Sequence, residues 1–257
     1  MKFARFPKFA LLLSLAGILT LALAGCGSSI SNLGLTQGNW AFSASSTTAL
    51  VTSSSPSFAL GGNLTQSGTN LTGTMYITQS VCIVPQFVSF TGTVKDKNVT
   101  LTSASFGGQV ISITASGSNN SLSGTYTVTG ECADSGTLTA SAVPSISGTW
   151  TGTVQVSAAP VTMSIALTQA ATASPGGTFA LTGTVTYTGS VCSSSATISP
   201  SSLQGTELNL NADLGTGSFN YSASLNSAAA PTSITGTYSV SDECASDQDQ
   251  TVTLTKQ

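Results

Sequence analysis

The chain has 257 residues, of which only 6% are charged and none is histidine. Three of its six cations lie in the first eight residues, so the remainder carries three lysines against nine acids, a formal charge of −6. Without a basic stripe there is nothing to neutralise phosphates, which excludes nucleic-acid binding, and without histidine no Ser-His-Asp triad can form. Disordered chains combine low hydrophobicity with high net charge. This chain has neither, so we expect a folded body.

The first 25 residues have the layout of a signal peptide. MKFARFPK is positively charged, FALLLSLAGILTLAL is an apolar run of about fifteen residues, and small residues follow it. A transmembrane anchor is the competing interpretation, but the run is shorter than the roughly 20 residues that a spanning helix needs. We therefore predict a signal helix within residues 1–25 that directs export.

The residues Leu23-Ala24-Gly25-Cys26 at the end of this run resemble the lipobox of bacterial lipoproteins. The resemblance implies that Cys26 carries two or three acyl chains and holds the mature protein to a membrane, where one chain alone would bind only marginally. In Gram-negative members an Asp after the cysteine favours inner-membrane retention. Gly27 stands there in this chain, which implies the outer membrane. Residues 26–37, rich in Ser and Gly, are predicted to be a flexible tether.

An internal repeat organises the rest of the chain. The landmark residues of the two copies are Trp40, Cys82 and Cys132, and Trp150, Cys192 and Cys244. Their spacings are 42 and 50 residues in the first copy and 42 and 52 in the second. GNW matches GTW, LTGTMYITQSVC matches LTGTVTYTGSVC, and LSGTYTVTGECA matches ITGTYSVSDECA. We predict β domain 1 over residues 38–142, a short linker over 143–147 and β domain 2 over 148–257.

Within each copy apolar residues alternate with Ser and Thr, which is typical of strands with one buried face. Leu122, Gly124, Tyr126 and Val128 share one such face. Roughly eight strands in each copy predict an all-β protein of two tandem antiparallel meanders, each a small up-and-down barrel or a sandwich. The glycine in the repeated LTGT word indicates strong strand bending and close approach of the opposite wall.

The GTW and LTGT words resemble those of avidin-type and lipocalin-like meanders. The resemblance implies an up-and-down architecture. It transfers no ligand site, because the polar and aromatic binding set of the avidins is not evident in this sequence.

Four cysteines remain after the lipidated Cys26, two in each copy, in a chain exported to an oxidising compartment. The repeat selects one of the three connectivities, Cys82 with Cys132 and Cys192 with Cys244. A redox or metal pair is the alternative, but the sequence has neither CxxC nor histidine. We therefore predict structural disulfides, one in each domain.

Few residues are candidates for chemistry. Glu131 and Glu243 each precede the second cysteine of their copy. They are either ligand contacts or plain loop carboxylates. One acid in each domain provides no glycosidase pair. Trp40 and Trp150 are either stacking platforms for sugars or core residues that plug the barrel floor. The acidic run 242–249 is either a Ca²⁺ site or a solvated loop, and it lacks EF-hand spacing.

These features predict no enzyme, no cofactor and no metal. The leading hypothesis is a membrane-anchored envelope lipoprotein with a structural or adhesive role, whose partner is an envelope or extracellular polymer. The alternative is a carrier of a small apolar ligand inside each barrel. Large side chains across the barrel axis would exclude such a ligand, whereas small ones would leave a cavity. The sequence does not indicate an oligomeric state.

Overall fold

A computed structural model describes residues 33–47, 58–156, 159–189, 193–215, 217–225, 230–241 and 246–257, without the side chains of 156, 193–194 and 246–248. All regular secondary structure in these ranges is β-strand, which confirms the all-β prediction. The signal segment, Cys26, Cys192, Cys244 and Glu243 lie outside the described residues. In the described part of the chain, no helix has the length and apolar character required to cross a membrane.

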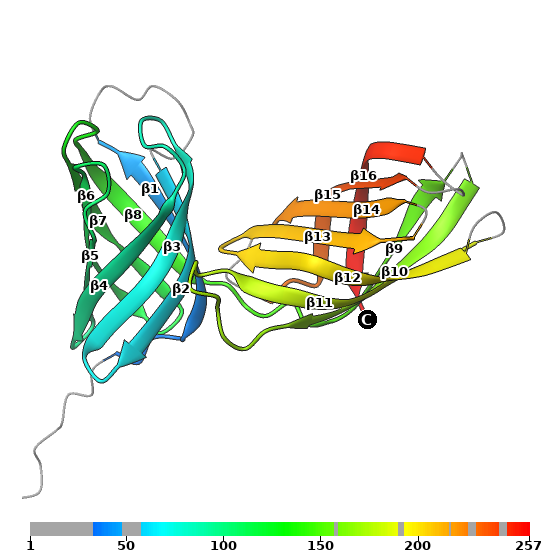
Figure 1. The fold of residues 1–257 in the computed structure, drawn as a ribbon. Coiled ribbons are helices and arrows are strands. Elements are labelled where there is room, and N and C mark those ends of the chain that lie inside the picture. The colour runs from blue at the N-terminus through cyan, green and yellow to red at the C-terminus, as the bar shows by residue number, and fades with distance from the viewer. Residues whose placement is uncertain are drawn as a thin grey trace, which may run out of the picture. The chain divides into compact units, whose positions relative to one another are not determined.

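Residues Asn32–Gln257 form one compact unit that contains two closed barrels. The first barrel consists of β1 (Gly38–Ser46), β2 (Phe58–Ser67), β3 (Asn70–Ser80), β4 (Phe87–Lys95), β5 (Asn98–Ser103), β6 (Val110–Ser118), β7 (Ser121–Thr129) and β8 (Asp134–Ala142). Each strand pairs antiparallel with the next, and β8 returns to pair with β1 (Figure 1). The fold is therefore an up-and-down barrel and not a sandwich.

The second barrel repeats this order. It consists of β9 (Gly148–Val156), β10 (Ala159–Gln169), β11 (Phe179–Thr188), β12 (Ser193–Gln204), β13 (Glu207–Asp213), β14 (Ser218–Ser224), β15 (Ser233–Ser241) and β16 (Ser246–Lys256). Strand β16 closes the ring on β9. The two tandem meanders that the repeat predicted are confirmed.

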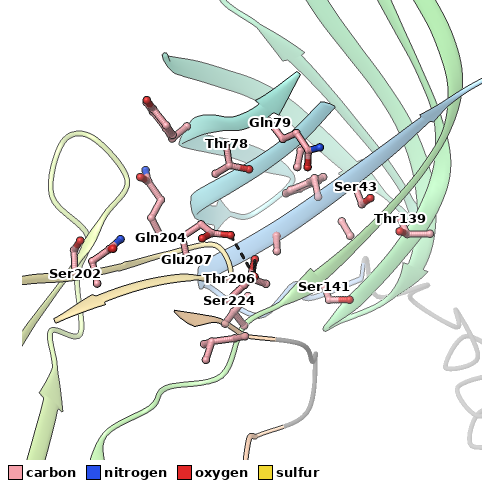
Figure 2. A pocket seen from close by; sticks show the side chains of 18 residues that line it. Ser43, Thr78, Gln79, Thr139, Ser141, Ser202, Gln204, Thr206, Glu207 and Ser224 are labelled. Carbon is pink, nitrogen blue, oxygen red and sulfur yellow. Dashed lines mark hydrogen bonds between the residues drawn. The ribbon is translucent and has the colours of Figure 1, made fainter. Parts of the chain in front are cut away.

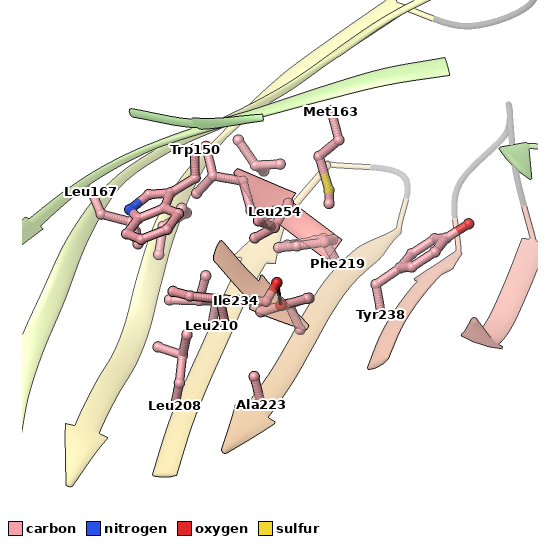
Figure 3. Packing of buried hydrophobic residues seen from close by; sticks show 14 of the residues in the cluster. Trp150, Met163, Leu167, Leu208, Leu210, Phe219, Ala223, Ile234, Tyr238 and Leu254 are labelled. Carbon is pink, nitrogen blue, oxygen red and sulfur yellow. Dashed lines mark hydrogen bonds between the residues drawn. The ribbon is translucent and has the colours of Figure 1, made fainter. Parts of the chain in front are cut away.

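Period-two alternation sets the inside and the outside of each barrel. In β5 the sequence NVTLTS alternates between exposed and buried residues, with the apolar side chains inside. The same rule fills the second barrel, where Trp150, Phe219 and Leu254 meet in the interior (Figure 3). The hydroxyl side chains that dominate the composition are left on the outer faces.

The disulfide between Cys82 and Cys132 is present, with Cα atoms 5.8 Å apart. It joins the loop after β3 to the turn before β8, at the same end of the barrel. The predicted pairing is thereby confirmed for the first domain, and the pairing of Cys192 with Cys244 stays a prediction.

The end of the predicted tether is tied to the first barrel. The Leu35 amide donates to Gln66 Oε1 at 2.7 Å, and Gln66 Nε2 donates to the Leu33 carbonyl at 3.0 Å. The Trp40 indole donates to the Thr36 carbonyl at 2.7 Å, and Leu35 is buried in the core. Residues 33–37, the N-terminal strap, are therefore part of the folded domain, which corrects the expectation of a flexible tether up to residue 37.

The strand glycines have a different role from the one expected. A Cβ atom on Gly124 would overlap the Thr114 carbonyl of the neighbouring strand β6, and one on Gly236 would overlap the Ser222 carbonyl of β14. The close approach is therefore between neighbouring strands and not between opposite walls, because strong coiling brings adjacent backbones together.

Candidate functional site

A turn of the second barrel is bound to the first strand of the first barrel. Asn39 of β1 donates from Nδ2 to the Gly205 carbonyl at 2.8 Å, and its Oδ1 accepts from the Gly205 amide at 2.7 Å. The Asn39 side chain is buried, so both bonds are shielded from water. A buried amide that satisfies both backbone groups of one residue fixes that residue's position and orientation.

Two glycines make this approach possible. A Cβ atom on Gly61 of β2 would lie 2.8 Å from Gly205 Cα, closer than real side chains allow. Gly205 itself has φ +54°, the left-handed region that the two-residue turn between β12 and β13 requires. The backbones of the two barrels therefore touch directly at this point.

The linker 143–147 strengthens the contact. The Val143 amide donates to the Asn39 carbonyl at 2.8 Å, and the Ile146 amide donates to Gln169 Oε1 at 3.1 Å. Val143 and Ile146 are both buried in the core of the second barrel. The linker is thus anchored at Val143 and Ile146, whereas Ser145 between them is exposed.

A cavity of about 810 Å³ opens beside this contact. Its wall on the first barrel is the outer face of four adjacent strands, β8, β1, β2 and β3. Strand register places Thr139, Ser43, Ala59 and Gln79 in one cross-strand row of the cleft wall. Because adjacent strands lie about 4.8 Å apart, this row is about 14 Å long. A second row of Ser141, Ala41, Gly61 and Tyr76 is interrupted at Gly61, which Gly205 covers. Most of these side chains are small, and the surface is hollowed there.

The facing wall comes from the second barrel and carries longer polar groups. Ser202, Gln204, Thr206 and Glu207 line it around the β12–β13 turn, together with Asn209. Figure 2 shows the side chains of Gln204, Glu207 and Ser224 opposite those of Ser43, Thr78 and Gln79. The cavity is a cleft with hydroxyl groups on both walls and with amides at Gln79, Gln204 and Asn209.

Many polar side chains of this cleft have no partner within the protein. Several facing hydroxyls elsewhere pair with each other across strands, as Thr93 does with Thr100 at 3.0 Å. By contrast, within the described ranges no side-chain hydrogen bond is formed by Ser43, Thr78, Gln79, Thr139, Ser141, Ser202 or Asn209. Their donors and acceptors are available to water or to a ligand.

Glu207 is the only charged side chain among the residues that line the cleft. It is exposed, and it accepts a hydrogen bond from the Ser224 hydroxyl at 3.3 Å. Tyr76 is the one half-buried aromatic ring of the lining, and its ring lies 4.8 Å from that of Phe87. The cleft therefore combines neutral hydrogen-bonding groups, one partly exposed aromatic ring and one carboxylate.

The structure places the two tryptophans in the cores. Trp40 and Trp150 are each 0% exposed, and the Trp150 indole donates to the Ile146 carbonyl at 2.9 Å, as Trp40 does to Thr36. Lys256 Nζ lies 5.4 Å from the Trp150 ring centre. The burial of Trp40 and Trp150 supports the core interpretation, because neither ring has a free face on which a ligand could stack.

Glu131 is exposed in the turn between β7 and β8, away from the cleft lining. Of the acidic run 242–249, only the Asp249 side chain is described, and its Oδ1 accepts from the Ser239 hydroxyl at 3.3 Å. Within the described residues, no three His, Cys, Asp or Glu side chains lie close enough to hold a metal ion. The acidic candidates of the sequence are therefore not brought together by the described structure.

Sequence reasoning missed the residue that joins the barrels. The repeated words GNW and GTW differ at one position, Asn39 against Thr149, and the asparagine is the side chain that binds Gly205. The LTQ word that recurs at Gln66 and Gln169 was a second signal, since both glutamines hold the segment preceding the first strand of their barrel.

No protein-family model, curated protein or solved structure matches this chain. The strand pairing itself defines the class, a tandem pair of closed, eight-stranded, up-and-down antiparallel barrels.

Proposed function

We propose that the protein is an exported lipoprotein of the cell envelope, anchored at the outer membrane through Cys26, that acts without catalysis as a structural or adhesive binding module. The observation that carries the binding role is the cleft beside the Asn39–Gly205 contact. Its unpaired hydroxyls and amides lie outside the barrels, on walls that hydrogen bonds and direct backbone contact hold together.

The barrel interiors favour this role over the carriage of a small apolar ligand. The rings of Phe58 and Tyr126 lie 4.8 Å apart although β2 and β7 are not neighbours. In the second barrel the rings of Tyr187 and Phe219 lie 6.0 Å apart across a similar gap. Side chains that meet across the axis occupy the space that a carried ligand would need.

The cleft lining favours binding over hydrolysis. Glu207 is its only carboxylate, whereas glycosidases of the common type use a pair of carboxyl groups on either side of the bond they cleave. The lining also lacks cysteine and histidine, the usual activated nucleophile and base.

The lipid anchor is tested by feeding radiolabelled palmitate to a Gram-negative host that expresses the full chain. We expect label in the wild-type protein and in the outer-membrane fraction. Cys26→Ala should lose the label and leave the membrane fraction, whereas the control Cys82→Ala should keep both. Labelling that survives in Cys26→Ala would overturn the assignment.

The binding role is tested by cosedimentation of the purified full chain, in detergent, with insoluble envelope polymer from its host. We expect the wild type to sediment with the polymer. Ala59→Trp places a large ring in the middle of a cleft row and should abolish cosedimentation. Ala166→Trp, a matched change on the exposed face of β10, should not. A wild-type protein that stays in the supernatant contradicts the proposal.

A further inference from the structure

We infer that the cleft between the barrels binds an uncharged oligosaccharide chain, an inference that rests on the proposed binding role and names its ligand class. A volume of about 810 Å³ lies within the range of small-molecule and short-polymer sites.

The hydroxyl rows match a polyhydroxylated ligand. Each serine or threonine hydroxyl both donates and accepts, and each amide offers two donors and an acceptor. Sugar hydroxyls have the same dual character, so they can pair with the unpartnered Ser43, Thr139 and Ser141 whichever way each hydroxyl rotates. The longer side chains of Gln79 and Asn209 reach from opposite walls toward the same space. The groups extend along a row of about 14 Å, which suits a chain of sugars better than a single ring.

Tyr76 supplies an apolar surface at one end of the second row. The packing of its ring against Phe87 at 4.8 Å limits its rotation. An aromatic ring fixed beside hydrogen-bonding groups can cover the C–H face of a sugar while the neighbours bind its hydroxyls.

The charge of the cleft excludes anionic polymers and favours neutral ones. No lysine or arginine lines it, and Glu207 would repel a carboxylate or phosphate of the ligand. The same carboxylate accepts strong hydrogen bonds from neutral hydroxyls. With no second acid in the lining, the cleft would hold the sugar chain without cleaving it.

The Asn39–Gly205 contact prepares the site before the ligand arrives. Because the second barrel's wall is attached to the first barrel's wall next to the cleft, little conformational freedom is lost on binding. The structure thus assigns Asn39 a positioning role, without contact to the ligand.

The test is titration calorimetry of the purified full chain in detergent. The probes are the hexasaccharides of β1→4 glucose, α1→4 glucose and β1→4 N-acetylglucosamine, with a galacturonate hexamer as the anionic control. We expect one of the neutral probes to bind and the galacturonate hexamer not to bind. Asn209→Ala should weaken affinity about tenfold, the loss of one or two hydrogen bonds, and Ala59→Trp should abolish it. Asn220→Ala, an exposed amide on β14, is the control and should bind as the wild type does.

Absence of binding by all three neutral probes at millimolar concentration overturns the ligand class. If the wild type still cosediments with envelope polymer in that case, the binding role survives and only the oligosaccharide assignment fails. Undiminished affinity in both Asn209→Ala and Ala59→Trp would place the sugar elsewhere and overturn the cleft. Preferred binding of the galacturonate hexamer would contradict the charge argument.

Discussion

The two barrels share their strand order but differ in the seam, the ladder between the first and the last strand that closes each ring. In the first barrel, residues 40–46 of β1 lie opposite residues 142–136 of β8, over nearly the whole strand. In the second, the paired register among the described residues covers Thr151 and Trp150 opposite Thr255 and Lys256, although β9 and β16 continue side by side as far as Gly152 and Thr253. A repeated sequence therefore specifies the same topology in both copies, while the length of the closing ladder differs between them.

Side chains reinforce the longer seam. Asp134 at the start of β8 accepts hydrogen bonds from the Ser46 hydroxyl at 2.6 Å and the Tyr126 hydroxyl at 2.5 Å. In the second barrel the corresponding tyrosine, Tyr238, donates to the Gln155 carbonyl at 2.9 Å. Because the first barrel has the longer closing ladder and hydrogen bonds to a charged acceptor are strong, we expect the first barrel to be the more stable.

The largest predicted effect concerns the buried tryptophans. Trp40→Ala and Trp150→Ala should each cost up to about 5 kcal/mol through the cavity and the lost burial. The second barrel should lose its structure first, because its seam is shorter. Hydrogen exchange with mass spectrometry, which measures β1–β8 and β9–β16 separately, checks this order. Equal protection of the two barrels in the wild type would contradict the expected difference in their stability.

Removal of the disulfide should reduce the difference in stability between the two barrels. Its loop spans 50 residues, so the chain-entropy model gives a loss of about 4 kcal/mol for the double variant Cys82→Ser with Cys132→Ser. Urea unfolding of the full chain, with hydrogen exchange measured in each barrel, should show the stability of the first barrel falling toward that of the second. A first barrel unaffected by this change would show that the disulfide does not contribute to the difference in stability between the barrels.

Removal of the Asp134 carboxylate tests the side-chain contribution to the seam. Asp134→Ala leaves the buried Tyr126 hydroxyl without this acceptor and should cost about 2 to 3 kcal/mol, within the range for hydrogen bonds to charged groups. Asp134→Asn, which keeps one acceptor, should lose less. Glu131→Ala, nearby and exposed, is the control and should change the free energy of unfolding by no more than about 0.5 kcal/mol. The measurement is the urea midpoint of the first barrel's transition.

The smallest predicted effect is a difference between the barrels in how their stability depends on pH. Tyr221 is buried, and burial raises the pKa of its hydroxyl above the ordinary value. The folded state therefore resists ionisation, so its contribution to stability is complete below the unfolded pKa of about 10 and is lost as pH rises beyond it. Ile113 occupies the corresponding place in the first barrel, opposite Tyr126 as Tyr221 is opposite Tyr238.

Tyr221→Phe should cost about 1 kcal/mol at neutral pH, because the hydroxyl donates to the Ile234 carbonyl at 3.2 Å. The variant should in return lose less stability than the wild type above about pH 10. Unfolding curves at neutral and alkaline pH check both parts. Identical alkaline profiles for the two proteins would argue against a contribution from this hydroxyl.

The sequence was sufficient to predict strands and their order, because alternation along a strand is a local signal. The same alternation occurs in both copies of the repeat. It could not separate barrel from sandwich, since closure depends on pairing Trp40 with Ala142, residues far apart in the chain. The N-terminal strap was missed because one buried apolar residue, Leu35, is hidden in a Ser- and Gly-rich segment.

The cleft was beyond prediction for a related reason. Ala41, Ala59 and Gln79 look like unremarkable outward positions of separate strands, and only the register makes them neighbours. The one local hint was the difference between Asn39 and Thr149 in otherwise repeated words. Its meaning required knowledge of the Gly205 backbone on the other side of the contact.

Ring closure has a consequence for how many copies can share a surface. A sheet edge exposes N–H and C=O groups that recruit strands from other molecules, and many proteins protect such edges with lysine or other charges. This chain has little charge to use for that purpose, with three lysines and nine acidic residues after its first eight residues. In the first barrel the ladder closes on itself instead, so crowding would bring neighbours together without offering an edge for aggregation.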